Sequence, residues 1–297
     1  MQADLDNIDR MLQAIVLSQY RRKIAEKNKL HLKPIILFKS KTIKESEKNA
    51  EDFNQKIKNL GIKDIQKIKS QSRGSVLEKA FDYFGKEKIG FENIATELKE
   101  DFLEEKCMLL DSNNINEEKQ LKLNSLEDTN NEIRAIFAVD MLNEGWDVLN
   151  LFDIVRLYNT RDSTGNRPGK TTIREAQLIG RGARYYPFKL KQEDDKFKRK
   201  FDQELENNMK IVEELYYHSS HNPKYIQELK TALRDTGIMP TQEPRIINLK
   251  VKENIKETIF WKNGFIFINK RIESDRSKIK DINDIDISKN FGPFNLR

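Results

Sequence analysis

Two short apolar runs flank a polar turn in the stretch EIRAIFAVDMLNEGWDVLNLFDIVRLYN, residues 132–159, and this stretch decides the fold. Each run is a few residues long and apolar almost throughout, which is typical of parallel strands that are buried on both faces. Similar runs are PIILFKS, which begins at Pro34, and CMLLD at residues 107–111. Strands that alternate with helical segments predict an α/β fold with a doubly wound, mostly parallel sheet.

The segments between these runs show the apolar spacing of helices. Residues 3–28 predict an amphipathic N-terminal helix, and Thr42 suits the N-cap of a charged helix that runs to about Leu60. A weaker strand is expected at residues 65–68, and a loop followed by a helix at residues 112–128. Further helices are expected at residues 76–83, 91–103, 172–184, 203–217 and 223–235.

The last third of the chain has a different texture. Residues 189–208 are charged and nearly free of large aliphatic side chains, which is typical of a solvated linker or of the start of a helix. Asn263 and Gly264 lie between two runs of β-branched and aromatic residues and predict a β-hairpin. Three parts are therefore expected, namely an amphipathic helix or linker at 1–30, an α/β domain at 31–190, and a helical segment followed by a β-hairpin extension at 191–297.

Composition narrows the class of protein. The 297 residues carry a net charge of +6, with 54 Lys and Arg against 48 Asp and Glu, which mildly favours a polyanionic partner. A single cysteine excludes an internal disulfide, and the three histidines lack partners for a metal site, so no structural zinc or other metal is expected. We find no long apolar run and no leader-like start, and we therefore expect a cytoplasmic protein without a membrane span.

The stretch EAQLIGRGARYYPF, residues 175–188, carries polar side chains at helical spacing. Gln177, Arg181 and Arg184 follow one another at i, i+4 and i+7 and therefore lie on one stripe of a helix. Such a stripe can point at a ligand. The alternative for the arginines taken alone is a solvated basic face without a ligand.

A neighbouring apolar stripe of the same helix consists of Ala176, Ile179 and Ala183 and is expected to pack against the domain. Gly180 and Gly182 would each cost about 1 kcal/mol in a helix interior. Their presence indicates either a close approach of another segment to the backbone or fraying of the helix.

A turn with ligand-binding potential follows the strand RAIFAVD. Gly145 would let the main chain approach a ligand, and Asp147 offers a carboxylate that can accept hydrogen bonds from hydroxyl groups. The alternative is a strand-ending turn in which Trp146 supplies local packing.

Two motifs in this order resemble those of superfamily-two helicases. The stretch VDMLNEGWD, residues 139–147, is similar to the fifth motif, T-D-x-x-x-x-G-x-D, with Val139 where many relatives have threonine. The stretch QLIGRGAR, residues 177–184, is similar to the sixth, Q/H-x-x-G-R-x-x-R. Together with their flanks they look most like the Res subunit of type III restriction-modification enzymes. The resemblance extends over about residues 33–235 and is specific over residues 134–188.

The resemblance implies the second RecA-like motor domain of such an enzyme. Arg181 and Arg184 would reach across the interdomain cleft to the ATP phosphates, with Gln177 beside them. Gly145 and Asp147 would line the nucleotide side of the cleft. A planar guanidinium suits this role because it matches the charge spread over a transferring phosphoryl group.

The chain lacks a Gly-x-x-x-x-Gly-Lys-Ser/Thr loop and an Asp-Glu-x-His-like strand end. ATP and Mg²⁺ would therefore be held mainly by an N-terminal RecA-like domain, and this chain would be the carboxyl-side portion of a larger motor. The partners implied by the resemblance are DNA, that N-terminal domain and a modification methyltransferase subunit.

Contacts to the DNA backbone are expected where strands end. The residues that carry donors for phosphate oxygens there are Lys39, Ser40, Lys41, Thr42, Ser112 and Asn113. The alternative for the first four is a polar strand end before a capped helix.

Two other motifs are rejected. The stretch GNRPGKTT, residues 165–172, has three residues between its glycines where a phosphate-binding loop has four, and Pro168 removes one amide. The stretch EDDK, residues 193–196, lacks the upstream carboxylate of a nuclease site and is interpreted as solvated surface.

Three functions follow from the sequence. The first is the motor portion of an ATP-dependent DNA translocase or helicase restriction subunit, inactive on its own. The second is a nucleic-acid-binding module with a motor-like fold that does not hydrolyse ATP. The third, a free-standing NTPase that uses Gly169, Lys170 and Thr171, requires tight ATP binding by this chain alone.

Overall fold

The computed structural model describes residues 6–110, 116–139, 148–160, 167–183, 186–204, 206–239 and 256–263. These residues fall into two units, Met1–Glu243 and Pro244–Arg297. The first unit contains the sheet and the helices around it. In the second unit, the described residues form the short helix α10, Ile259–Asn263.

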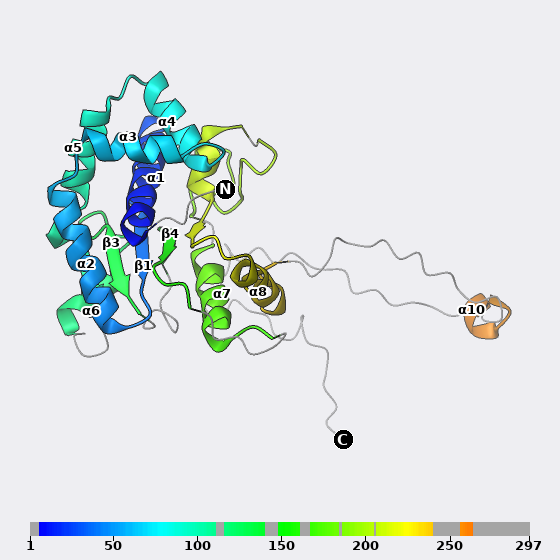
Figure 1. The fold of residues 1–297 in the computed structure, drawn as a ribbon. Helices are drawn as coiled ribbons and strands as arrows, with labels where there is room; N and C mark the ends of the chain where they lie inside the picture. The colour runs from blue at the N-terminus through cyan, green and yellow to red at the C-terminus, as the bar shows by residue number, and fades with distance from the viewer. Residues whose placement is uncertain are drawn as a thin grey trace. The chain divides into compact units, whose positions relative to one another are not determined.

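A five-stranded, all-parallel sheet forms the centre of the first unit (Figure 1). Its strands are β1 Ile35–Lys39, β2 Cys107–Leu110, β3 Ala135–Ala138, β4 Leu151–Arg156 and β5 Tyr216–His218, in the spatial order β2-β3-β1-β4-β5. The first strand is central, since Leu37 pairs with Ile136 on one side and with Ile154 on the other. The prediction of an α/β fold with a parallel sheet is confirmed.

Helices connect the strands and cover both faces of the sheet. In the first unit they are α1 Asn7–Lys27, α2 Ile43–Lys58, α3 Ile62–Gln71, α4 Val76–Lys86, α5 Phe91–Asp101, α6 Glu117–Asn124, α7 Lys170–Gly182 and α8 Pro223–Asp235. Two short 3-10 helices, η1 Glu104–Lys106 and η3 Asn208–Glu213, precede β2 and β5.

The two faces of the sheet are buried in separate apolar cores. On one face, the ring of Phe38 lies 4.8 Å from that of Phe137 and 5.2 Å from that of Phe53 on α2, within a core that also takes in α1, α3, α4 and α5. On the other face, Leu37 and its neighbours pack with α6 and with Leu178 of α7. Burial on both sides explains why the strands are apolar throughout.

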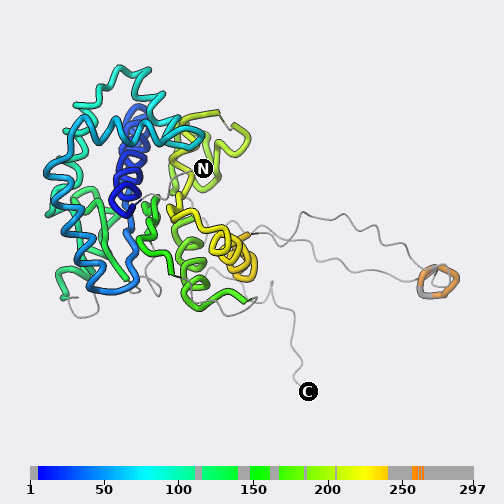
Figure 2. The backbone as a smooth tube through the Cα atoms, in the orientation of Figure 1, coloured from blue at the N-terminus to red at the C-terminus, as the bar shows by residue number. Residues whose placement is uncertain are grey.

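Helix α1 is part of the first core. Figure 2 shows it between the helices α2–α5 and the segment that contains η3, in agreement with its contacts to α2, α4, α5 and η3. Its expected amphipathic character is wrong, because polar side chains are buried along with apolar ones. Arg21 is fully buried and pairs with Asp153 of β4, with 2.5 Å between Nη1 and Oδ2. His218 of β5 lies 2.9 Å from the other oxygen of Asp153. The helix is therefore tied to the sheet by charge as well as by packing.

Three expectations for local structure are wrong. Residues 65–68 lie in α3 and not in a strand, and the buried Ile65 and Ile68 are spaced for one face of a helix. The helix expected at 203–217 is replaced by η3 and by the strand β5, which hydrogen-bonds to β4. Helix α10 occupies the position of the first strand of the expected hairpin. The second strand of the hairpin lies outside the described residues.

Candidate functional site at the carboxyl edge of the sheet

A buried ion pair joins the end of β4 to α7. Arg156 Nε lies 2.9 Å from Glu175 Oε1, and the two side chains are 2% and 0% exposed. The other two guanidinium nitrogens each donate to a carbonyl oxygen of the chain after β4, with 2.5 Å from Nη1 to Tyr158 O and 2.7 Å from Nη2 to Thr160 O. A buried pair of charges needs such additional hydrogen bonds to be stable, and each nitrogen of Arg156 makes one.

Three tyrosines complete this network. Tyr158 and Tyr225 donate their hydroxyl hydrogens to the two oxygens of Glu175, and the hydroxyls of Tyr217 and Tyr225 lie 2.6 Å apart. Burial and the negative charge of Glu175 raise the pKa of all three hydroxyls. The tyrosines therefore remain donors at neutral pH, and they fix α7 relative to β4, β5 and α8.

The start of α7 is held by α8. Glu228 Oε1 accepts hydrogen bonds from Gly169 N and from Thr172 Oγ1, each at 2.8 Å. A carboxylate thus takes the backbone amide that a phosphate-binding loop would direct at a phosphate. This contact supports the rejection of GNRPGKTT as such a loop, although residues 165 and 166 lie outside the described residues.

The glycines of α7 mark close packing. A Cβ at Gly180 would lie 2.6 Å from Ile238 Cδ1, and one at Gly182 would lie 3.1 Å from Leu151 Cδ2 and from Leu215 Cδ1. Close approach of another segment to the helix backbone at Gly180 and Gly182, one of the two alternatives given by the sequence, is therefore confirmed.

The prediction that Ala176, Ile179 and Ala183 pack against the domain is only partly correct. Ala176 is buried and Ile179 is partly buried, but Ala183 is exposed. The buried face also contains the polar residues Thr172 and Glu175. Their hydrogen bonds to α8 and β4 explain why polar side chains can lie on this face.

The opposite side of α7 carries the predicted polar stripe. Gln177 is exposed and Arg181 is partly exposed. Lys170 and Arg174, also exposed, extend the same stripe toward the start of the helix. Arg184, Gly145 and Asp147 lie outside the described residues, so their roles stay predictions.

The loop after β1 separates into two buried and two exposed side chains. Lys39 Nζ donates to Val139 O at 3.2 Å, and Ser40 Oγ accepts a hydrogen bond from Asn49 Nδ2 at 3.0 Å. Both side chains are buried, and their expected contact with DNA stays a prediction. Lys41 and Thr42 are exposed.

Thr42 also caps α2, as expected. Its Oγ1 accepts from Glu45 N, and Glu45 Oε2 accepts from Thr42 N, each at 3.2 Å. The reading of this loop as a polar strand end before a capped helix is thus realised, and a contact of Lys41 and Thr42 with DNA stays a prediction. Ser112 and Asn113 lie outside the described residues.

Sequence reasoning missed the residues that tie α1 to this edge. Asn7 Nδ2 donates to Leu157 O at 3.0 Å and to Asn49 Oδ1 at 3.3 Å, and Asn7 Oδ1 accepts from Arg10 Nη2 at 2.5 Å. Polar residues in a first helical turn look solvated in sequence, so no local signal was present. Arg156 did carry a signal, because a charged side chain in a buried strand needs a partner.

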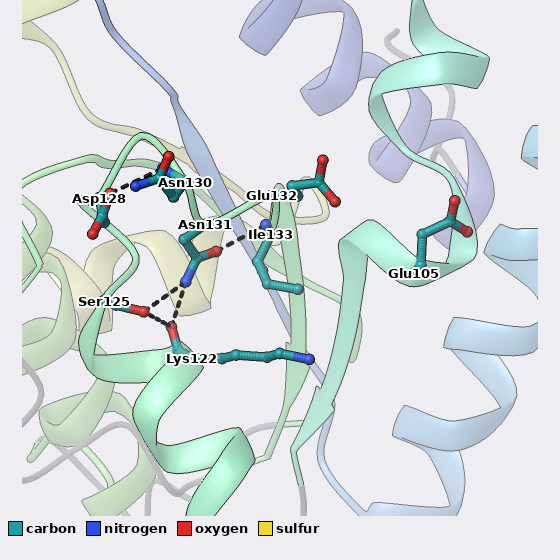
Figure 3. A pocket seen from close by; sticks show the side chains of 8 residues that line it. All are labelled: Glu105, Lys122, Ser125, Asp128, Asn130, Asn131, Glu132 and Ile133. Carbon is teal, nitrogen blue, oxygen red and sulfur yellow. Dashed lines mark hydrogen bonds between the residues drawn. The ribbon is translucent and has the colours of Figure 1, made fainter.

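The connection from α6 to β3 lines a cavity of its own. This cavity of about 290 Å³ opens where the connection passes Glu105 (Figure 3). There Asn131 donates to Lys122 O and Ser125 Oγ and accepts from Ile133 N, so its side chain holds the loop together. This cavity is at the amino edge of the sheet, away from α7, and we assign no nucleotide to it.

The described residues contain neither a metal-binding cluster nor a helix suited to cross a membrane. They contain no group of three or more His, Cys, Asp and Glu side chains placed to hold a metal ion. None of their helices combines the length and the apolar character that a membrane crossing requires.

One family model covers most of α7 and all of α8. The family model HI_1054_N, described as an N-terminal region, matches residues 171–242. No solved structure matches the chain at a significant level. An uncharacterized protein from Haemophilus influenzae is 34% identical over 117 residues, which are 38% of this chain and 25% of that protein.

A protein from the same organism, named as a probable type III restriction-modification enzyme HindVIP Res subunit, is 33% identical over 179 residues. The match covers 53% of this chain and 35% of that protein, so the chain spans about a third of the relative's length. Over about half of its residues, this chain is therefore homologous to a protein named as a type III restriction Res subunit.

Proposed function

We propose that this chain is the carboxyl-side motor portion of an ATP-dependent DNA translocase or helicase that serves as a restriction subunit. In this function Arg181 of α7 and Arg184, which follows the helix in sequence, contact ATP that is bound by an N-terminal RecA-like domain. The similarity to a protein named as a Res subunit supports the class of enzyme. The observation that carries the role of α7 is its anchoring by Arg156 and Glu175 at the carboxyl edge of the sheet.

Anchoring matters because charge stabilisation is most effective when the charged group is held in place before the reaction. One side of α7 is fixed to β4, β5 and α8 by buried hydrogen bonds, and the polar stripe that contains Arg181 lies on the other side. The start of α7 lies at the carboxyl ends of the strands, whereas Arg181 lies near the other end of the helix, where Gly182 packs against Leu151 at the start of β4.

A contact with the DNA backbone is proposed for the loop after β1. Lys41 and Thr42 are exposed at the carboxyl end of the central strand. An ammonium and a hydroxyl group both donate to phosphate oxygens without reading bases, which suits a motor that moves along any sequence.

The test uses the subunit that carries both motor domains. We expect Arg181→Ala and Arg184→Ala to lower ATP turnover at saturating DNA by at least about a hundredfold, since arginines in this role contribute roughly 10³ to 10⁵ in rate. Replacement by lysine should rescue little because an ammonium cannot make the planar, two-pronged contact. DNA binding and thermal unfolding should be nearly unchanged.

Arg234→Ala is the matched control, because Arg234 is exposed on the neighbouring helix α8. Parental turnover in both α7 variants would reject the proposal. If the chain is instead a binding module without hydrolysis, the unmodified subunit should also show no DNA-stimulated ATP turnover. A fluorescent ATP analogue, titrated with and without the N-terminal domain, separates this module from a free-standing NTPase.

A further inference from the structure

A turn after α7 presents an aromatic ring to solvent. Phe197 is 74% exposed and lies in the run Lys196–Lys200, of sequence KFKRK, in which the four other residues are basic. An exposed aromatic ring among cations is the combination that proteins use to hold single-stranded nucleic acid, through stacking and phosphate contacts.

Backbone hydrogen bonds hold this turn in shape. Asp195 Oδ1 accepts from Phe197 N at 3.0 Å, and Asp195 O accepts from Lys198 N at 3.3 Å. At the end of the turn, the two oxygens of Glu213 accept from Lys200 N at 2.7 Å and from Phe201 N at 3.1 Å. The ring of Phe201 is buried. The turn is thus anchored on both sides of Phe197, which keeps that ring on the outside.

Three carboxylates near the turn, those of Asp194, Asp195 and Asp202, accept hydrogen bonds. Asp194 Oδ2 accepts from Lys191 N and Leu190 N, and these backbone hydrogen bonds lower the pKa of its carboxyl group. Asp202 pairs with Arg199 at 2.7 Å. Within Lys196–Lys200 no acidic residue intervenes, so Lys196 and Lys198 flank Phe197 directly in sequence.

We propose that this turn binds single-stranded DNA, with one base stacked on Phe197 and the adjacent phosphates on Lys196 and Lys198. The choice of DNA rests on the proposed function, but the surface is a separate one. The segment that leads to the turn is attached near the amino edge of the sheet, where Tyr186 OH donates to His31 O at 3.4 Å. The expected backbone contact of Lys41 and Thr42 is at the carboxyl edge.

The first experiment measures binding of a fluorescein-labelled oligo(dT) of twelve nucleotides by anisotropy, without nucleotide. Stacking on one aromatic ring is worth about 1–3 kcal/mol, so Phe197→Ala should weaken binding by about tenfold or more. Phe197→Trp should preserve binding because the larger ring also stacks. Leu121→Ala is the control, since Leu121 is 64% exposed on α6, and it should bind like the parent. Circular dichroism should show parental folding for every variant, because Phe197 contributes little to the core.

The second experiment places the base. The same oligonucleotide with one 5-iodouracil is irradiated with the protein, and we expect the cross-linked peptide to contain Phe197. Equal affinity of the Phe197→Ala variant and the parent, or a cross-link confined to other peptides, would overturn the proposal. A Phe197-dependent association with anionic lipid vesicles but not with the oligonucleotide would assign the turn to a membrane surface and would also overturn it.

Failure of the DNA-binding proposal for the Phe197 turn can be distinguished from failure of the proposed motor function. Arg181→Ala should leave oligo(dT) binding unchanged and lower ATP turnover, whereas Phe197→Ala should do the reverse at saturating DNA. Loss of only one of these effects identifies which of the two assignments is wrong.

Discussion

Asp153 shows how one buried residue can depend on two side chains from distant parts of the chain. It is fully buried on β4, with Arg21 on one oxygen and His218 on the other. Burial alone would raise the pKa of this carboxyl group, but Arg21 and His218 outweigh burial and lower it below its ordinary value. The carboxylate is therefore charged in the folded protein.

Asp153→Asn should destabilise the fold by about 3–5 kcal/mol at neutral pH, because it leaves Arg21 buried without a counter-charge. A carboxyl group whose folded pKa is depressed contributes stability that is complete above its unfolded pKa, about 3.9, and is lost as the pH falls through the folded value. The free energy of unfolding should therefore fall below about pH 4 more steeply in the parent than in the variant. Urea titrations from pH 2 to pH 7 measure both effects.

Asp202→Asn is the control, since its pair with Arg199 is exposed and should contribute less than about 1 kcal/mol. Equal stability of the Asp153 variant and the parent at neutral pH would show that the buried pair does not hold α1 to the sheet.

At the scale of single residues, sequence reasoning succeeds where the chemistry is local. The cap at Thr42 was predictable because its partner Glu45 lies three residues away. The pairing of Arg156 with Glu175 was not predictable, because the two residues are nineteen positions apart and meet only in the folded protein. The hydrogen bond from Lys39 at the end of β1 was missed for the same reason, since its partner Val139 follows β3, a hundred residues later in the chain.

At the scale of the element, α7 allows a matched pair of substitutions. Gly180→Ala should stabilise the protein by up to about 1 kcal/mol, because alanine favours the helix and the tip of Ile238, 37% exposed, can rotate away. Gly182→Ala should destabilise it by about 1–3 kcal/mol, because the added methyl group meets the buried Leu151 in the sheet. Urea unfolding measures both, and effects of the same sign would contradict this account of α7 packing.

The start of α7 gives a second prediction. Lys170→Ala should leave the affinity of the full subunit for a fluorescent ATP analogue nearly intact, because Glu228 already takes the amide of Gly169 that a phosphate-binding loop would use. Lys230→Ala on α8 is an exposed control of the same charge. A selective loss of nucleotide binding on changing Lys170 would restore the phosphate-loop reading.

The elements that sequence predicted well are those with a strong local period. The apolar runs of β1, β3 and β4 and the helix α8 were predicted close to their observed bounds. Helix α3 was missed because its β-branched isoleucines at positions 62, 65 and 68 suggest a strand by residue type, whereas their spacing of three fits one face of a helix. Strand β5 was missed because its hydrogen bonds come from β4, more than sixty residues earlier along the chain.

At the scale of the whole molecule, the net positive charge predicts that the affinity for DNA depends on the salt concentration. With about three phosphate contacts, at Lys41, Lys196 and Lys198, the logarithm of the affinity for single-stranded DNA should fall against the logarithm of the salt concentration with a slope of about −2. Binding should show no sequence preference, since none of these groups reads a base edge. Anisotropy titrations of several oligonucleotides between low and moderate salt test this, and an affinity that does not change with salt would contradict it.

The burial of α1 has a consequence for the synthesis of the protein on the ribosome. Arg21 Nε donates to Ile211 O, so α1 finds this hydrogen-bond partner only after 190 further residues have been made. At about 5–20 residues per second, the helix waits roughly 10 to 40 s with its apolar side chains exposed. Arrested nascent chains that end before residue 211 should be cut within α1 by added protease, whereas chains with residues 1–239 outside the ribosome should resist. Such a delay makes nascent α1 a client for chaperones that shelter apolar segments, and equal cutting of both chains would exclude it.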